Sequence, residues 1–182
     1  MKLFQKNLMA SEDVKAMLGS GRFYAEDAMA DIHDGAIVVE GDLENHTVYA
    51  GLKDINVRKI TAPVANTDKV VIVDYVGVSE GNINGVLYRE GYKTAGLVGL
   101  AGEAVRYRRL AVGDTFWLAT DNFNGTPEVG KFAAPEAGAT TLLIGDAKVE
   151  GALNVKIETT KKLTEGTVDT DTLYLCRVVA IA

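Results

Sequence analysis

From residue 35 onward, glycine, asparagine and aspartate cut the chain into short apolar runs, and this punctuation constrains the fold more than any other feature. The runs lie at residues 36–40, 47–50, 55–60, 69–76, 86–89, 105–108, 115–119, 131–133, 141–144, 153–158 and 173–181. Many short runs without a helix-length pattern between them are typical of an all-β protein, either an antiparallel β-barrel or a β-sandwich. A parallel α/β fold is disfavoured because its crossover connections need helices.

Two of these runs, 69–76 and 173–181, are apolar on both alternating faces. A strand of this kind is buried on both sides, so we expect both runs in the middle of the structure. The run 153–158 alternates instead, which predicts one buried face and one exposed face. The expected inward residues are Leu153, Val155 and Ile157, and the expected outward residues are Asn154, Lys156 and Glu158.

The first 34 residues have a different pattern and contain all four methionines. Ser11 is a candidate N-cap, acids follow it, and Val14, Met17 and Leu18 then supply apolar residues at helical spacing. Gly19 and Gly21 would end this helix after about two turns. So short a helix is not stable alone and must dock on something.

We therefore expect residues 1–34 to form an N-terminal arm with one small helix, and residues 35–182 to form the β-barrel or β-sandwich body. The arm packs either on its own body or, through Met9, Met17 and Leu18, on another subunit. Methionine suits the second alternative because its flexible side chain adapts to irregular partners.

The net charge of the chain indicates which kinds of partner it can bind. Acidic residues number 25 and basic residues 19, which gives a net charge of −6. Nucleic acid is disfavoured as a main partner because phosphate binding needs clustered Lys and Arg. The chain shows neither the apolar core of a signal peptide nor a run long enough to span a membrane, so we expect a reducing, cytoplasm-like site of synthesis.

Arg106, Arg108 and Arg109 form the only basic cluster of the sequence. On a strand, Arg106 and Arg108 share one face, while Arg109 shares the other with Tyr107. We favour a partner-facing interaction surface. The alternatives are ion pairs within the chain and, least favoured, a nucleic-acid contact.

No motif predicts catalysis, a metal or a cofactor. Asp31, His33, Asp34 and His46 lack the spacing of a metal site. The glycines between 96 and 102 match neither phosphate-binding motif. Cys176, the single cysteine, lies in an apolar run and is expected to be a small buried hydrophobe rather than a catalytic thiol.

A resemblance suggests what such a chain does. The N-terminal segment, the Gly/Asn-punctuated strands, Val-Gly-Asp-Thr-Phe-Trp-Leu-Ala at 112–119 and Leu-Tyr-Leu-Cys-Arg-Val-Val at 173–179 resemble small virion proteins of tailed bacteriophages. Among these the chain is most similar to head decoration (cement) or head-fibre-base proteins. The resemblance implies a many-copy, non-catalytic structural protein without a cofactor, often trimeric, bound to the major capsid protein outside the shell.

We therefore expect a homo-oligomer, most simply a trimer, that is made in the host cytoplasm and resides on the capsid surface. Its expected partners are the major capsid protein or other virion proteins, and neither nucleic acid nor a membrane. A phage tail-tube or head–tail joining protein is the alternative within the virion. A cellular β-barrel that binds a small ligand is the alternative from another class, because barrels can hold a ligand in their mouth. An enzyme is the least favoured class.

Overall fold

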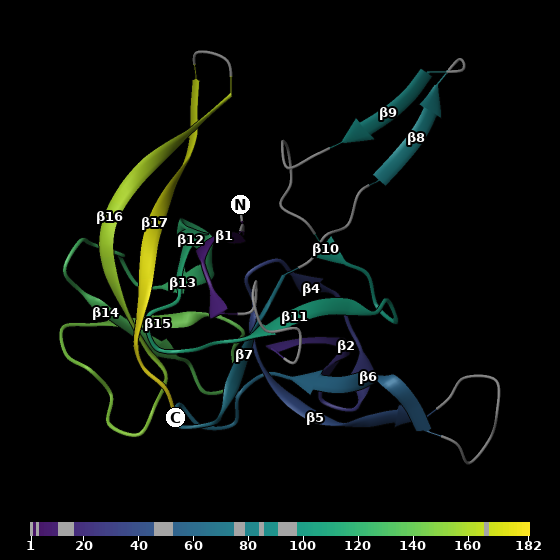
Figure 1. Cartoon of the computed structure of the whole chain (residues 1–182), viewed down its shortest axis with the longest axis horizontal. Helices are drawn as coiled ribbons and strands as arrows, with labels where there is room; N and C mark the ends of the chain where they lie inside the picture. The colour runs from purple at the N-terminus through teal and green to yellow at the C-terminus, as the bar shows by residue number, and fades with distance from the viewer. Residues whose placement is uncertain are drawn as a thin grey trace.

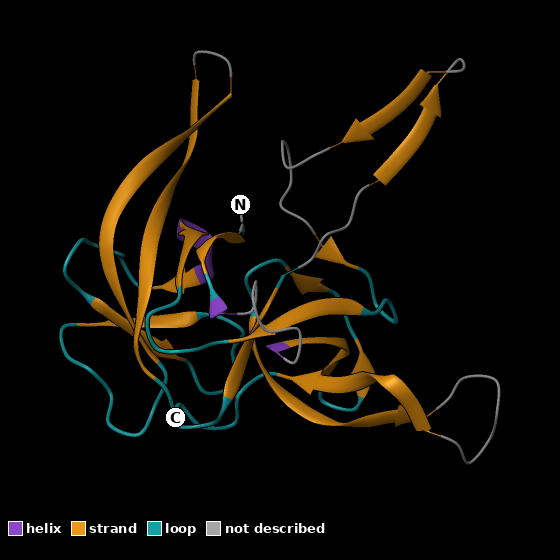
Figure 2. Cartoon of the chain, viewed as in Figure 1, coloured by secondary structure: helices purple, strands orange, loops and turns teal. Residues whose placement is uncertain are grey.

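The computed structural model describes residues 2, 4–10, 17–45, 53–74, 79–83, 86–90, 98–165 and 168–182. Within these ranges the chain is mostly β-strand, with the short 3₁₀ helix η3 at Thr120–Asn122 (Figure 2). The prediction of an all-β chain is confirmed. Each predicted run coincides with a strand except 47–50, which lies outside the described residues.

One sheet has six strands and closes on itself. Its order is β11 (Val105–Arg109), β7 (Val70–Val73), β5 (Ile37–Asn45), β6 (Lys53–Thr61), β2 (Leu18–Ala25) and β3 (Ala28–Met29). Strand β2 also pairs with β11, so five strands form a hydrogen-bonded ring. The β2–β6 pair is parallel and the other pairs of the ring are antiparallel.

The second large sheet has seven strands. Its order is β1 (Phe4–Leu8), β12 (Thr115–Ala119), β17 (Val168–Ala180), β16 (Asn154–Glu165), β14 (Phe132–Pro135), β15 (Leu142–Gly145) and β13 (Phe123–Asn124). All its pairs are antiparallel except β13–β15. Strand β17 lies between β12 and β16, which confirms the central position expected for the run 173–181.

Two smaller sheets each hold two strands. Strand β4 (Ile32–His33) pairs with β10 (Val98–Gly99) close to the ring. Strands β8 (Ser79–Ile83) and β9 (Val86–Glu90) pair with each other and form a hairpin that stands away from the rest of the molecule (Figure 1).

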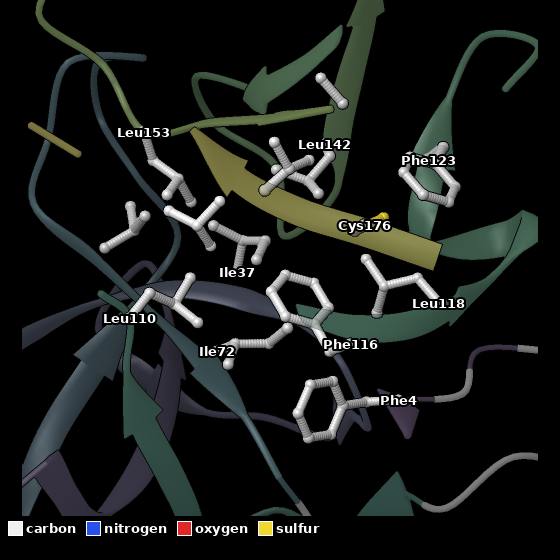
Figure 3. Close-up of a cluster of buried hydrophobic side chains, with 14 of the residues drawn as sticks. Phe4, Ile37, Ile72, Leu110, Phe116, Leu118, Phe123, Leu142, Leu153 and Cys176 are labelled. Carbon is white, nitrogen blue, oxygen red and sulfur yellow. The ribbon is translucent and has the colours of Figure 1, made fainter. Parts of the chain in front are cut away.

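The buried apolar side chains form two main clusters. One lies between the two large sheets and includes Phe116, Leu118 and Cys176 from the seven-stranded sheet and Ile37 and Ile72 from the ring (Figure 3). The other fills the interior of the ring. Its buried members are Phe23, Ile32, Ala36, Val38, Ile60, Val71, Val73, Val105 and Tyr107. The two sheets therefore share a core.

Strand β7 is the element that joins the clusters. Val70 and Ile72 belong to the cluster between the sheets, whereas Val71 and Val73 belong to the interior of the ring. All four side chains are buried. The expectation that the run 69–76 is buried on both faces is confirmed for residues 70–73, while residues 75 and 76 lie outside the described residues.

The predicted helix stays a prediction, since only its last residues, Met17 and Leu18, are described. Leu18 begins strand β2, and Gly19 and Gly21 lie within that strand rather than ending a helix. Both glycines leave space for side chains inside the ring of strands. A Cβ at Gly21 would lie 2.6 Å from Cγ2 of Ile60, and one at Gly19 would collide with the aromatic ring of Tyr107. Residues 11–16, the rest of the predicted helix, lie outside the described residues.

The described residues before position 34 are not a separate arm. Phe4 and Met9 are 4% and 5% exposed and belong to the cluster between the sheets. The backbone N–H of Phe4 donates to Oδ2 of Asp34 at 2.9 Å, and that of Ala10 donates to Oδ1 of Asp114 at 2.7 Å. Strand β1 is thus an edge of the seven-stranded sheet, and β2 is a member of the ring.

The predicted alternation in strand β16 holds for Leu153, Val155 and Ile157, which are all buried. Asn154 was expected to point outward, but it is 1% exposed. Its amide nitrogen donates to the carbonyls of Val149 and Ala152, so the side chain closes the turn before the strand. A register shift between Asn154 and Val155 breaks the alternation at this point.

Candidate functional site

The arginines of β11 divide between the two faces of the strand as the sequence predicts, but their partners lie within the chain. Arg106 and Arg108 share Oδ2 of Asp74, at 2.7 Å from Nη2 and 2.5 Å from Nε respectively. Asp74 directly follows β7, which pairs with β11, so the register of the ring brings the three side chains together. The Arg108 side chain is only 3% exposed.

Arg109 lies on the opposite face, among polar groups at one end of the ring. Its Nη2 lies 2.6 Å from Oε1 of Glu40, and Nε of Arg58 lies 2.9 Å from the same oxygen. The Tyr107 hydroxyl also hydrogen-bonds to Glu40. Burial, together with the charge of Glu40, raises the pKa of Tyr107 to about 12.

These contacts are the ion pairs within the chain that the sequence left open as an alternative. Asp74 directly follows β7, which pairs with β11, whereas Glu40 lies on β5, one strand beyond β7. The partner-facing surface stays a prediction. A buried guanidinium such as that of Arg108 needs an anionic partner, and Asp74 supplies it. Arg109 and Arg58 keep side-chain exposures of 32% and 38%, so both can also reach solvent.

A pocket of about 370 Å³ opens beside this second group of charges. Glu40, Arg58 and Arg109 line it from the ring, while Leu153 and Ile181 line it from the segments that flank β16 and β17. The pocket therefore lies where the two large sheets meet. It combines guanidinium groups with an apolar wall.

The three N-terminal candidates have different surroundings. Met9 is buried in the cluster between the sheets, so it does not offer a docking side chain to another subunit. Met17 and Leu18 are half-buried at the start of β2. The exposed apolar neighbour is Leu8, which is 71% exposed and which the sequence pattern did not single out.

The remaining sequence candidates behave as structural residues. Cys176 is a free, fully buried thiol whose pKa is raised by burial, as expected for a small hydrophobe. Asp34 accepts a backbone hydrogen bond from Phe4, and Asp31 accepts one from Ala101. Among the residues that the structure describes, no His, Cys, Asp and Glu side chains gather as a metal-binding group; His46 is not among them.

Two hairpins extend beyond the packed body (Figure 1). Strands β8 and β9 pair only with each other among the described strands. Strands β16 and β17 pair as far as Glu165 and Val168, whereas β12 pairs with β17 only as far as Leu173. The outer parts of both hairpins therefore have backbone edges that no other described strand covers.

Comparison with known proteins gives no relative: no protein-family model, no curated protein and no solved structure matches the chain. Within the described part of the chain, no helix has the length and apolar character needed to cross a membrane.

Proposed function

We propose that the chain is a non-catalytic structural protein of a tailed-bacteriophage particle, which binds the outside of the capsid lattice as a decoration protein. The observation that carries the proposal is the pair of hairpins, β8–β9 and β16–β17, that extend beyond a well-packed body (Figure 1). The ring of five strands is the barrel of this body, and the seven-stranded sheet packs against it.

A projecting hairpin needs a partner surface. A two-stranded hairpin is at best marginally stable in water, because it lacks a third strand or a packed face. Its open edges can pair with a strand of another chain. Contacts with neighbouring subunits would supply the missing packed face and a strand for the open edges. A repeated lattice offers such contacts in many copies.

The same reasoning favours a homo-oligomer, most simply a trimer, with the major capsid protein as the main partner. Each contact of a hairpin with the shell is small. Linking several copies raises the overall avidity about 10²–10⁴-fold above that of one contact. Decoration proteins act in this way without chemistry or a cofactor.

The proposal is tested first on particles. Particles purified from the phage that encodes the chain should contain it in many copies, measured by quantitative mass spectrometry. Purified protein should co-sediment with heads that lack it and saturate at a stoichiometry fixed by the lattice. Its absence from the particles, together with no saturable binding to heads, would contradict the proposal and favour the cellular alternative.

A variant in which a short Gly/Ser linker replaces residues 79–90 tests the role of the β8–β9 hairpin. Because β8 and β9 pair with no other described strand, the body should keep the melting temperature of the full chain. Binding to heads should fall by at least about tenfold, since one set of contacts is lost from every copy. Replacing the exposed turn at 128–130 in the same way is the matched control and should leave binding unchanged.

A further inference from the structure

The pocket beside Arg58 and Arg109 has the size and chemistry of a small-ligand site. Its volume of about 370 Å³ lies within the range of small-molecule pockets in proteins. It lies at the junction of the two large sheets, a position typical of binding sites between packed units. It is separate from the two projecting hairpins, so what it binds is independent of the proposed structural role.

The charges around the pocket do not cancel. Glu40 places one carboxylate between two guanidinium groups: its Oε1 lies 2.9 Å from Nε of Arg58 and 2.6 Å from Nη2 of Arg109. Lys69, an exposed side chain, also lines the pocket. The remaining charged lining side chain, Asp68, accepts hydrogen bonds from the backbone N–H groups of Val64 and Ala65 and keeps its negative charge. Three cationic and two anionic side chains thus line the pocket, which leaves one net positive charge.

The rest of the wall is apolar. The side chains that form it are Val39, Val70, Leu110, Leu153 and Ile181. Ile181 is 50% exposed although it is a large aliphatic residue, so a ligand that covered it would remove apolar surface from water. Guanidinium groups on one side and aliphatic groups on the other fit a ligand with one anionic end and one apolar end.

We propose that this pocket binds a small organic acid, with its carboxylate on Arg58 and Arg109 and its apolar chain against Leu110, Leu153 and Ile181. Glu40 already accepts from Nε and Nη2 of Arg109 and pairs with Nε of Arg58, and the Gly41 carbonyl accepts from Nη1 of Arg58. The ligand carboxylate would therefore accept from Nη2 of Arg58 and be attracted by the charge of Arg109 beside it. A single negative charge also balances the one net positive charge of the five charged side chains that line the pocket. The apolar wall selects against inorganic anions, which have nothing to place on it.

The probe for this site is octanoate, added to the full chain. Its binding is measured by calorimetry and by the rise in the melting temperature of the protein. Octanoate should bind saturably at one site per chain. Octanol, which has the same chain but no charge, and inorganic phosphate, which has charge but no chain, should each bind at least about tenfold more weakly.

Arg58→Gln is the informative variant because Arg58 is partly exposed and Glu40 keeps Arg109 as a partner. It should weaken octanoate binding by about tenfold, the effect expected from losing a hydrogen bond between charged groups. Arg177→Gln is the matched control, since it removes one positive charge from an exposed pair with Glu158 on another surface. It should leave octanoate binding within about twofold of the original.

Several results would overturn the proposal: no saturable binding of octanoate, equal binding of octanol or phosphate, or equal losses in Arg58→Gln and Arg177→Gln. A variant without residues 181–182 adds a further check, because both residues line the pocket. It should bind octanoate more weakly, through the loss of the Ile181 wall. Octanoate binding that appeared only in this variant would mean that these residues fill the pocket themselves, and the proposal would be wrong.

Discussion

The Tyr107 ring occupies the space that a side chain at Gly19 would need, inside the ring of five strands. Strands β2 and β11 pair directly, with Gly19 opposite Tyr107 in the register. Tyr107 is 1% exposed, and its hydroxyl hydrogen-bonds to Glu40 at the end of the ring of strands. A large side chain on one strand is thus accommodated by the absence of one on its neighbour.

Gly19→Ala should lower the free energy of unfolding by about 1–3 kcal/mol, because the added methyl group collides with a buried ring that cannot move away. Urea denaturation measures the change. In a Tyr107→Leu background the same substitution should have a smaller effect, since the shorter side chain leaves space. Gly145→Ala is the control, because the nearest atom to its added Cβ lies 3.6 Å away. Equal effects of Gly19→Ala in both backgrounds would show that Tyr107 is not the obstacle.

The N-terminal strand provides a second test, in two adjacent residues. Met9→Ala should destabilise the protein by about 2–5 kcal/mol, because it opens a cavity between the two sheets. Leu8→Ala removes a similar volume from a side chain that is 71% exposed, and should change the stability by less than about 0.5 kcal/mol. Thermal or urea denaturation of both variants gives the comparison. Similar small effects at both positions would mean that β1 is held weakly, as a detachable arm would be.

Asp74 provides a third test. Asp74→Asn should lower the free energy of unfolding by about 3–5 kcal/mol, because it removes the anion beside the buried Arg108 guanidinium. Since the total stability of a domain is about 5–15 kcal/mol, this variant should unfold at a much lower urea concentration. Glu158→Gln breaks the exposed pair with Arg177 and should have a far smaller effect. Comparable effects of the two variants would contradict the assignment of Asp74 as a structural anion.

Most strands between residues 35 and 182 could be predicted because each carries its own signal, whereas β8, β10 and β13 have no apolar run of their own and were not predicted. Runs such as 69–76 and 173–181 are apolar on both faces, and turn residues bound them, so their position in the structure follows from local sequence. Strand β2 was missed because its inward face carries Gly19 and Gly21 where an apolar residue would be expected. The alternation Gly-x-Gly-x-Phe, from Gly19 to Phe23, is the signal that could have revealed it.

The partners of the arginines could not be predicted in the same way. Asp74 and Glu40 lie more than thirty residues before the arginines of β11 that they bind, and only the register of the ring brings them together. The pocket depends on a contact between the two sheets, which no local pattern encodes. Sequence periodicity predicts which face of a strand a residue occupies, but it does not predict which strand lies opposite.

The hydroxyl of Tyr107 makes the stability of the protein depend on pH in the alkaline range. Burial raises its pKa from 10.0 to about 12, so the folded state holds this proton more tightly than the unfolded state. The resulting stabilisation is present in full below about pH 10 and is lost as the pH rises from about 10 through about 12. The expected loss is at most about 3 kcal/mol, since one pKa unit corresponds to about 1.4 kcal/mol.

Comparison with Tyr107→Phe isolates this contribution from the lysines that titrate in the same range. At about pH 9 the variant should be less stable than the original chain, because it lacks the hydrogen bond to Glu40. At about pH 11 the difference should shrink, because the original chain now loses the contribution of the protonated phenol. Tyr174→Phe removes a hydroxyl from a half-buried tyrosine that contacts Phe123, and it controls for the loss of any phenol. A difference between the original chain and Tyr107→Phe that stays constant across this range would show that Tyr107 does not hold its proton more tightly in the folded state.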